Sequence, residues 1–439
     1  MRIESGERLI KVTSPVKTKT GLEIKYSCPV YAALELASPS SLNSKAKLKQ
    51  LFEYSIDLIG EKYENMKKRK AELLFCGAVV SLALAGCKNE PLTMIVGTYT
   101  DECASRGVYS YFFDQEKGML VDGAEEGRFE EAPGAEGRVE MRNPSYLTLS
   151  ADGKFVYAVS EVPDSSASAV TLGIDTKTCG MQLLGSELTD GKDPCYISTS
   201  GKVVMTANYS SGNVTEFPIG DDGRLLPHDF LYETGLGGPD STRQNLPHAH
   251  CALFNAAGTE LYVSEFSADA VTRYELATRH GKRIQLPSDF GPRHIALNGD
   301  ESKAYVLGEL SGDVAVIDTE RDSVIQIVCA DSVHARGSAD IHLSPDGRFL
   351  YASNRLQNDG IAIFRVGKDG FLTYAGYQNT GVHPRNFNIT PNGKFLLAAC
   401  RDSGCIQIFR CDARTGLLSD TGRAIVLDKP VCIVFAPSL

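Results

Sequence analysis

A repeat of about 47 residues constrains the fold of this chain more than any other feature. Six copies are present, and they begin NPSYLTLS at Asn143, DPCYISTS at Asp193, LPHAHCALF at Leu246, GPRHIALN at Gly291, SADIHLSP at Ser338 and HPRNFNIT at His383. A seventh copy, KPVCIVFAP from Lys429, stops after its first strand. With the proline of each copy as a marker, replaced by Ala339 in the fifth, the copies recur every 45 to 53 residues.

Each copy carries the signals of antiparallel strands. A short apolar segment meets a tight turn such as Asp152-Gly153 or Asn392-Gly393, where asparagine, aspartate and glycine accept positive φ. A second strand rich in β-branched and aromatic residues follows, then a third and a weaker fourth. Four antiparallel strands at this period predict an all-β chain, a seven-bladed β-propeller, rather than a helical array.

The two ends of the repeat region complete each other. MIVGTYT from Met94 and GVYSYFFD from Gly107 supply the second and third strands of a copy without a first strand, and KPVCIVFAP supplies that strand. We therefore expect the N- and C-terminal strands to pair in one blade. Closure of this kind also protects sheet edges.

The charge of the chain is unevenly distributed. Of its 45 Lys and Arg and 55 Asp and Glu, residues 1–86 hold 14 and 9, so the remainder carries a formal charge of −15. Nucleic acid is not expected as a partner, because its phosphates would be repelled over most of such a surface. An anionic ligand would need a local cluster of arginines.

A segment before the repeats resembles a bacterial lipoprotein signal. From Met66 the chain reads MKKRKAELLFCGAVVSLALAGC, a basic start, a short apolar run and a lipobox, Leu84-Ala85-Gly86-Cys87. The resemblance implies that Cys87 is lipidated and that the protein is anchored by lipid alone in the bacterial cell envelope, periplasmic or at the surface. Without such a signal the protein would be cytoplasmic.

Residues 1–65 precede this signal, although a signal belongs at the start of a chain. We interpret them as an upstream extension from a mis-assigned start, with Met66 as the true start. The alternative is a signal anchor with a cytoplasmic tail. The expected organisation is thus extension 1–65, signal peptide 66–87 and propeller 88–439.

The nine cysteines after Cys87 form no CxxC pair, which indicates neither a disulfide framework nor a zinc site. Cys400 and Cys405 flank a short connection and could pair across strands. The remaining thiols are expected to be buried apolar residues.

Aligning the copies places two rings of side chains on one rim of the propeller, because the first strand starts where the second strand ends. The position after the marker reads Ser145, Cys195, His248, Arg293, Asp340, Arg385 and Val431. The position after the second strand reads Tyr99, Glu161, Tyr209, Phe266, Glu309, Arg355 and Arg401. Charge is therefore concentrated at the predicted mouth of the central channel.

Arginine dominates this predicted mouth. Arg293, Arg355, Arg385 and Arg401 would suit a carboxylate or a phosphate, although pairs such as Glu309 with Arg355 could instead neutralise each other. His248 lies at the rim and His250 deeper on the same face. His250 could be a buried, hydrogen-bonded residue, and the two histidines could begin a metal site, but no third ligand is arranged around them, so no metal is expected.

The motifs NYSSGNV, LPHAH, GPRH, YVLGELSGDV, ASNR and HPRNF resemble those of the lactonase family of seven-bladed propellers. This family includes bacterial 6-phosphogluconolactonase and the fungal carboxymuconate-lactonising cycloisomerase. The resemblance covers about residues 94–437 and implies an enzyme. Because lactones also hydrolyse unaided, we expect a modest site that needs no cofactor. The resemblance implies catalytic roles for His248, Arg293, Glu309 and Arg355. Substrate contacts are expected from Asn208, Tyr209, His250, Arg385 and Arg401.

Hydrolysis of a sugar lactone is therefore the leading functional hypothesis. Glu309 or His248 would activate water, while Arg293 and Arg355 would hold the substrate anion or the developing oxyanion. The export signal makes an unphosphorylated aldonolactone or uronate-derived lactone as plausible as a cytoplasmic phosphorylated one. The alternatives are a muconate-type cycloisomerase and a non-catalytic envelope propeller that binds a glycan or protein. The sequence does not indicate an oligomeric state.

Overall fold

The computed structural model describes residues 2–4, 11–13, 91–121 and 137–436 of the chain. The chain divides into two compact units, Met1–Asn89 and Glu90–Leu439. In the first unit the described residues form one antiparallel pair, β1 (Arg2–Glu4) and β2 (Lys11–Thr13). Met66 and Cys87, and with them the predicted lipoprotein signal, lie outside the described residues.

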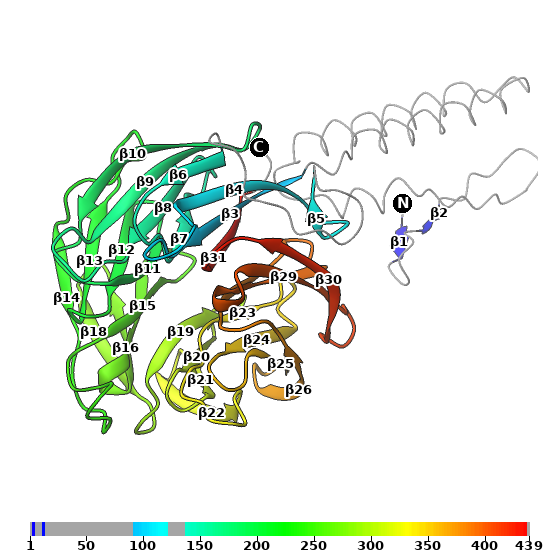
Figure 1. Cartoon of the computed structure of the whole chain (residues 1–439). Coiled ribbons are helices and arrows are strands. Elements are labelled where there is room, and N and C mark those ends of the chain that lie inside the picture. Colours follow the sequence, from blue (N-terminus) through cyan, green and yellow to red (C-terminus); the bar gives the residue numbers. More distant parts are fainter. Residues whose placement is uncertain (1, 5–10, 14–90, 122–136, 437–439) are drawn as a thin grey trace, which may run out of the picture. The chain divides into compact units, whose positions relative to one another are not determined.

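The second unit is a seven-bladed β-propeller, as the repeat predicts (Figure 1). Six blades contain four consecutive antiparallel strands, with the first strand innermost. Blade 1 is β7 (Leu147–Leu149), β8 (Phe155–Ser160), β9 (Ser168–Asp175) and β10 (Gly180–Leu188); blade 2 is β11 (Pro194–Thr199), β12 (Val203–Asn208), β13 (Asn213–Pro218) and β14 (Phe230–Glu233); blade 3 is β15 (Ala249–Phe254), β16 (Glu260–Glu265), β17 (Ala270–Glu275) and β18 (His280–Gln285).

Blade 4 is β19 (Pro292–Leu297), β20 (Lys303–Gly308), β21 (Asp313–Asp318) and β22 (Ser323–Cys329); blade 5 is β23 (Ile341–Leu343), β24 (Phe349–Asn354), β25 (Gly360–Val366) and β26 (Leu372–Asn379); blade 6 is β27 (Pro384–Ile389), β28 (Phe395–Cys400), β29 (Cys405–Cys411) and β30 (Leu418–Val426). Among the described residues, two short 3-10 helices, η3 (Phe266–Ala268) and η4 (Arg401–Ser403), follow β16 and β28.

Blade 7 joins the two ends of the repeat region, and the predicted closure is confirmed. Its inner strand is β31 (Pro430–Ala436), which pairs antiparallel with β3 (Leu92–Thr98). β4 (Gly107–Asp114) follows, and its outer edge is shared by β5 (Met119–Leu120) and β6 (Arg138–Glu140). The fourth strand of this blade is therefore divided between two short pieces.

The apolar core lies between neighbouring blades. One cluster joins Tyr305 and Val316 of blade 4 to Leu350 and Phe364 of blade 5. The tight turns have the predicted backbone, since Gly153 and Gly393 have φ of 68° and 71°. Five further clusters join the other neighbouring blades, so each blade buries both faces against its neighbours.

All nine cysteines of the described propeller are free thiols. Cys400 and Cys405 are cross-strand partners, as their spacing predicts, but they form no disulfide. Within the described ranges, no helix has the length and apolar character needed to cross a membrane.

Candidate active site

β-Bulges at the rim release one residue of an inner strand from its pairing. In five blades the register slips near the start of the inner strand. The extra residue is Cys195, His250, Arg385 or Val431, and in β19 it falls at Arg293 and His294. A bulged residue has no ladder partner and its side chain is re-aimed, so these positions can meet across blades.

The strand register corrects the alignment of the third repeat. Ala249 pairs with Glu265 just as Pro292 pairs with Gly308, so Ala249, not Pro247, is the equivalent of the marker proline. His250 is therefore the equivalent of Cys195 and Arg385 on the bulge, and His248 lies just before the strand. The proline pattern is misleading here because Pro247 ends the long loop between β14 and β15.

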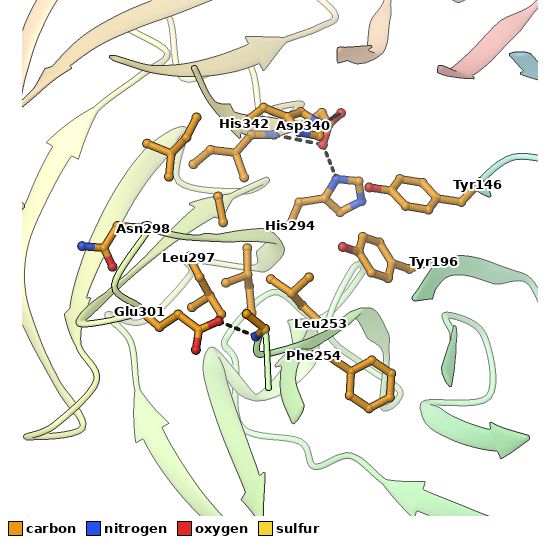
Figure 2. Close-up of a pocket in the computed structure, with 16 residues that line it drawn as sticks. Tyr146, Tyr196, Leu253, Phe254, His294, Leu297, Asn298, Glu301, Asp340 and His342 are labelled. Atoms are coloured by element: carbon orange, nitrogen blue, oxygen red, sulfur yellow. Dashed lines mark hydrogen bonds and ion pairs between the residues drawn. The ribbon is translucent and has the colours of Figure 1, made fainter. Parts of the chain in front are cut away.

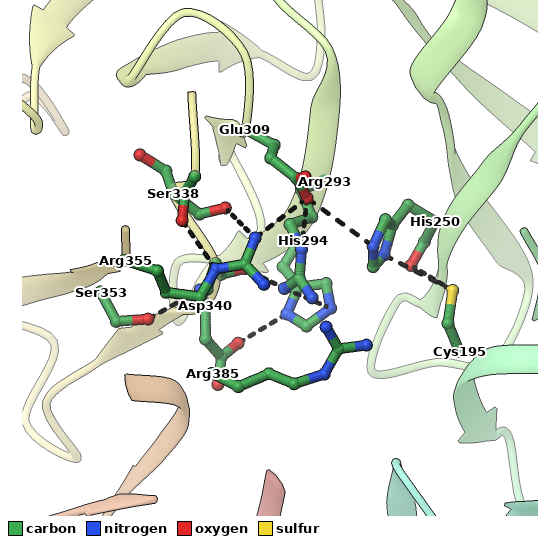
Figure 3. Close-up of polar contacts among 12 residues, drawn as sticks. Cys195, His250, Arg293, His294, Glu309, Ser338, Asp340, Ser353, Arg355 and Arg385 are labelled. Carbon is green, nitrogen blue, oxygen red and sulfur yellow. Dashed lines mark hydrogen bonds and ion pairs between the residues drawn. The ribbon is translucent and has the colours of Figure 1, made fainter. Parts of the chain in front are cut away.

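Glu309 lies at the centre of the predicted site, immediately after β20 (Figure 3). Its Oε2 accepts a hydrogen bond from Nε of Arg293 at 2.9 Å and lies 3.3 Å from Nη2 of Arg355. Nη2 of Arg243 donates to its Oε1 at 2.6 Å. Nε2 of His250 is 3.9 Å from Oε2. Three of the four predicted catalytic residues are thus in direct contact.

This environment keeps Glu309 ionised. Burial alone raises the pKa of its carboxyl, but Arg355, Arg293 and Arg243 lower the pKa to about 2. A carboxylate with so low a pKa is a poor acceptor of a proton from water near neutral pH. Glu309 is therefore suited to hold the arginines rather than to act as the general base.

Arg243 belongs to the site but is not part of either ring. It lies in the long loop between β14 and β15, and its guanidinium is 5.4 Å from the centroid of the Phe266 ring. Its side chain is 38% exposed, whereas that of Arg293 is 2% exposed. The repeat pattern could not reveal it, because the loop has no counterpart in the other copies.

His248 is held in one tautomer. Its Nδ1 donates to the carbonyl oxygen of Tyr209 at 2.7 Å, and its ring stacks on the Tyr209 ring with centroids 4.1 Å apart. Nε2 has no hydrogen-bond partner among the described residues and keeps some contact with solvent. Burial lowers the pKa of the imidazole. Neutral His248 therefore presents an unprotonated nitrogen at the rim.

A second ion pair borders the arginine cluster. Nη2 of Arg385 lies 3.6 Å from Oε2 of Glu161, and the Tyr99 hydroxyl donates to Oε1 of Glu161 at 2.9 Å. The Arg385 guanidinium is 5.2 Å from the centroid of the Tyr99 ring. The mouth thus holds four guanidinium groups, of Arg243, Arg293, Arg355 and Arg385, against two carboxylates, of Glu161 and Glu309. This excess of guanidinium groups over carboxylates at the rim favours an anionic ligand.

Two predicted substrate-binding residues lie outside this cluster. Asn208 is fully buried in blade 2, where its amide bonds Asn213 at 3.1 Å and Thr215 at 2.8 Å, so it supports the blade instead of facing the channel. Arg401 binds both carboxylate oxygens of Asp402, at 2.7 and 2.8 Å. Its charge is neutralised beside the site.

Two further residues, His294 and Asp340, lie behind the arginines. Nε2 of His294 is 3.3 Å from Nη1 of Arg293, and its Nδ1 is 2.6 Å from Oδ1 of Asp340. A cavity of about 470 Å³ lies on their other side, with Tyr146, Tyr196 and His342 also in its wall (Figure 2). The cavity lacks the arginines, which makes the rim the better candidate for an anion.

The described residues include no group of three or more His, Cys, Asp or Glu side chains suited to a metal ion. Nδ1 of His250 is instead 3.5 Å from the Cys195 thiol. The chemistry available at the rim is that of an imidazole, a carboxylate and several guanidinium groups.

A family model and a curated relative both place this chain in one family of propellers. The family model described as "Lactonase, 7-bladed beta-propeller" matches residues 93–435. A 6-phosphogluconolactonase of Bacillus subtilis is 32% identical over 357 residues, which cover 77% of this chain and 97% of that protein.

Solved structures agree with this assignment. A protein of Bacteroides uniformis provisionally named 6-phosphogluconolactonase superposes with a TM-score of 0.74 at 46% identity, covering 79% of this chain and 99% of the other. A periplasmic gluconolactonase of Pseudomonas aeruginosa superposes with a TM-score of 0.72 at 28% identity, with the same two coverages.

Proposed function

Because the chain belongs to the lactonase family of seven-bladed β-propellers, we propose that it hydrolyses an anionic sugar lactone at the arginine-rich rim. The observation that carries this proposal is the excess of guanidinium groups over carboxylates around Glu309 and Arg293. Guanidinium groups that converge in this way suit the planar, bidentate recognition of a carboxylate or phosphate. The substrate class is thus an aldonolactone that carries a phosphate or a carboxylate.

His248 acts as the general base. Its Nδ1–H is committed to the Tyr209 carbonyl, so Nε2 accepts the proton of the attacking water. Burial keeps the imidazole neutral near pH 7. The Tyr209 ring holds the imidazole plane through stacking at 4.1 Å. Water attack on the lactone carbonyl gives a tetrahedral oxyanion, whose collapse breaks the ring C–O bond while protonated His248 returns its proton to the leaving oxygen.

Arg293 stabilises that oxyanion. Its Nε is committed to Glu309 and its Nη1 to the Ala339 carbonyl and His294, whereas Nη2 has no hydrogen-bond partner in the described part of the chain. A fixed guanidinium with one free nitrogen stabilises developing charge without reorganisation. Arg243 and Arg385, which are more exposed, hold the anionic substituent of the substrate.

The direct test is acid release from a panel of lactones by the full chain, corrected for spontaneous hydrolysis. The panel is glucono-1,5-lactone, its 6-phosphate, a uronate-derived lactone and carboxymuconolactone. The proposal expects kcat/KM to be about ten- to a hundredfold higher for an anionic lactone than for the neutral one, since a hydrogen bond to a charged group contributes about 1.5–3 kcal/mol. No acceleration of any lactone would leave a binding propeller as the better account.

Isotope incorporation separates hydrolysis from cycloisomerisation. In water enriched in oxygen-18, hydrolysis places one labelled oxygen in the carboxylate product. A product without the label, with a shifted double bond, would assign the site to cycloisomerisation instead.

We further propose that the protein is lipidated at Cys87 and works in the cell envelope. The support is the segment 66–87, with its basic start, apolar run and small residues before cysteine. Growth with labelled palmitate in a bacterial host should label the wild-type protein and not Cys87→Ser. The mass of the mature protein separates the two interpretations of the N-terminal segment. A chain that begins at Cys87 indicates a cleaved lipoprotein signal, whereas a chain that keeps residues 1–65 indicates the signal anchor.

A further inference from the structure

Arg293 contacts buried His294, which in turn contacts buried Asp340, and the proposed mechanism gives neither residue a role. β19 carries Arg293 and His294 in succession, and the bulge between Pro292 and Ile295 allows both side chains to leave the ladder. Arg293 is 1% exposed and His294 is 3% exposed. Their neighbour Asp340 comes from the segment before β23, in the next blade.

The hydrogen bonds of Asp340 fix the state of His294. Asp340 accepts from backbone N–H of Ile341 at 3.0 Å, from Nδ2 of Asn386 at 2.5 Å and from Nε2 of His342 at 2.9 Å. Burial raises the pKa of this carboxyl, but His342 and His294 outweigh burial and lower the pKa below its usual value, so Asp340 is ionised. Ionised Asp340 can only accept, so Nδ1 of His294 must donate to it.

The tautomer of His294 in turn fixes the orientation of the Arg293 guanidinium. With Nδ1 protonated, Nε2 of His294 has a free lone pair, and Nη1 of Arg293 donates to it at 3.3 Å. Burial, with Arg293 beside it, lowers the pKa of this imidazole to about 4, so it stays neutral at physiological pH. The Ala339 carbonyl accepts from the same Nη1. Only Nη2 of Arg293 is then left to turn toward a ligand.

We propose that Asp340 and His294 are positioning residues that orient Arg293, through the chain Asp340–His294–Arg293–Glu309 (Figure 3). This inference rests on the proposed function, because orientation matters only if Arg293 meets the oxyanion. A carboxylate that fixes the tautomer of a histidine is a general device for holding the group on its far nitrogen. Here the group held is a guanidinium.

The kinetic test compares two substitutions of His294. His294→Phe keeps the bulk of the ring but removes the acceptor, and kcat should fall about ten- to a hundredfold with KM changed less than threefold, because an interaction of the transition state is lost. His294→Gln can return an acceptor to Nη1 of Arg293 and should recover most of the rate. His228→Gln removes a similar histidine–aspartate pair, 2.8 Å long, in blade 2 and should leave kcat unchanged.

Thermal melting of each variant separates positioning from support of the fold. A His294→Phe protein that melts within a few degrees of wild type but has normal kcat overturns the positioning role. Equal losses in His294→Phe and His294→Gln overturn it as well, since only the former lacks the acceptor.

A second measurement does not depend on catalysis. Nitrogen-15 spectra of the histidine-labelled full chain should show His294, assigned by its absence in His294→Gln, with Nδ1 protonated and Nε2 unprotonated between pH 5 and 8. An Nε2-protonated ring overturns the chain of contacts even if the protein hydrolyses lactones. Absence of lactonase activity would overturn the proposed function while leaving the result on the tautomer intact.

Discussion

At the residue scale, the roles of the ionisable groups follow from their neighbours. Glu309 and His248 are both candidates for the base from their positions in the repeat. Three guanidinium groups hold the pKa of Glu309 at about 2, whereas burial leaves His248 neutral with an accessible Nε2. The two residues therefore take different tasks, and each difference can be measured.

His248 should control the acid side of the pH profile. Its pKa is lowered from 6.5 by burial, so the active neutral form persists to a pH below 6.5. We expect kcat/KM to be level from about pH 7 to 8 and to fall as Nε2 is protonated at lower pH. The measurement is initial rate against pH with spontaneous hydrolysis subtracted.

The control for this profile is His248→Gln. It should lower kcat/KM by about 10²- to 10⁴-fold and abolish the acid limb. An acid limb that persists unchanged in this variant would assign the limb to another group.

Glu309 should matter for stability as well as for activity. Glu309→Gln removes the carboxylate that Arg243, Arg293 and Arg355 share, and breaking such a buried pair costs about 3–5 kcal/mol. Urea denaturation at pH 7 measures the cost. Glu320→Gln, at an exposed position, should change stability by less than about 0.5 kcal/mol.

The pH dependence of this difference has a definite sign. The folded pKa of Glu309 is about 2, below its ordinary 4.5, so its stabilising contribution is complete above about pH 4.5 and is lost as the pH falls toward 2. The gap between wild type and Glu309→Gln should therefore be constant from pH 5.5 to 7 and smaller at pH 3.5. A gap that widens on acidification would contradict the ion-pair account.

At the scale of the elements, the loop between β14 and β15 completes the site. It delivers Arg243 to Glu309 and is tied to two other loops by Arg336, which donates to Asp240 at 2.6 Å and to Asp289 at 2.7 Å. Arg336 itself has no described contact with Glu309 or Arg293. It therefore acts on the site only by holding the loop.

Releasing this tie should weaken substrate binding. Arg336→Gln should raise KM roughly three- to tenfold with kcat within twofold of wild type, because the loop with Arg243 then loses its fixed position. Arg348→Gln breaks an exposed pair with Asp346 at a distant turn and should change neither constant. Unchanged KM in Arg336→Gln would show that the loop holds its position without the tie.

The strands and loops also show which residues of the site could be predicted from the sequence and which could not. Seven of the nine predicted catalytic and substrate-binding residues lie together: Tyr209, His248, His250, Arg293, Glu309, Arg355 and Arg385. Arg243 lies in a loop outside the repeat, and the bulges that aim Arg293 and His294 leave no periodic signal. Because Pro247 is the marker of the third copy, the sequence alignment is displaced by two residues. It therefore puts His248 at the ring position that His250 occupies. Asn208 is at a rim position but turns into its own blade.

At the scale of the whole molecule, closure of the ring stabilises the fold and brings the site residues of separate blades together. β31 pairs with β3 over residues more than 300 positions apart in the chain, and Ile433 packs with Met94 and Val96. The period of the repeat and its truncated last copy were enough to predict this closure. The sequence did not predict that the outer strand of blade 7 is divided in two, because β5 and β6 are too short to show an alternating apolar pattern.

Removing the closing strand should prevent stable folding. A chain that ends at Lys429 lacks β31 and exposes the β3 edge together with the apolar face of blade 7. We expect loss of the cooperative thermal transition, measured by circular dichroism. A chain that ends at Ala436 retains β31 and should melt like wild type; a cooperative transition without β31 would contradict the closed ring as the source of stability.

The central claim, that residues from separate blades form one anion site at the rim, is tested most directly by a crystal structure with an aldonate product bound. The account predicts the product carboxylate within hydrogen-bond distance of Nη2 of Arg293 and Nε2 of His248. A product bound instead in the cavity beside Tyr146, Tyr196 and His342, with the arginine cluster unchanged, would contradict it.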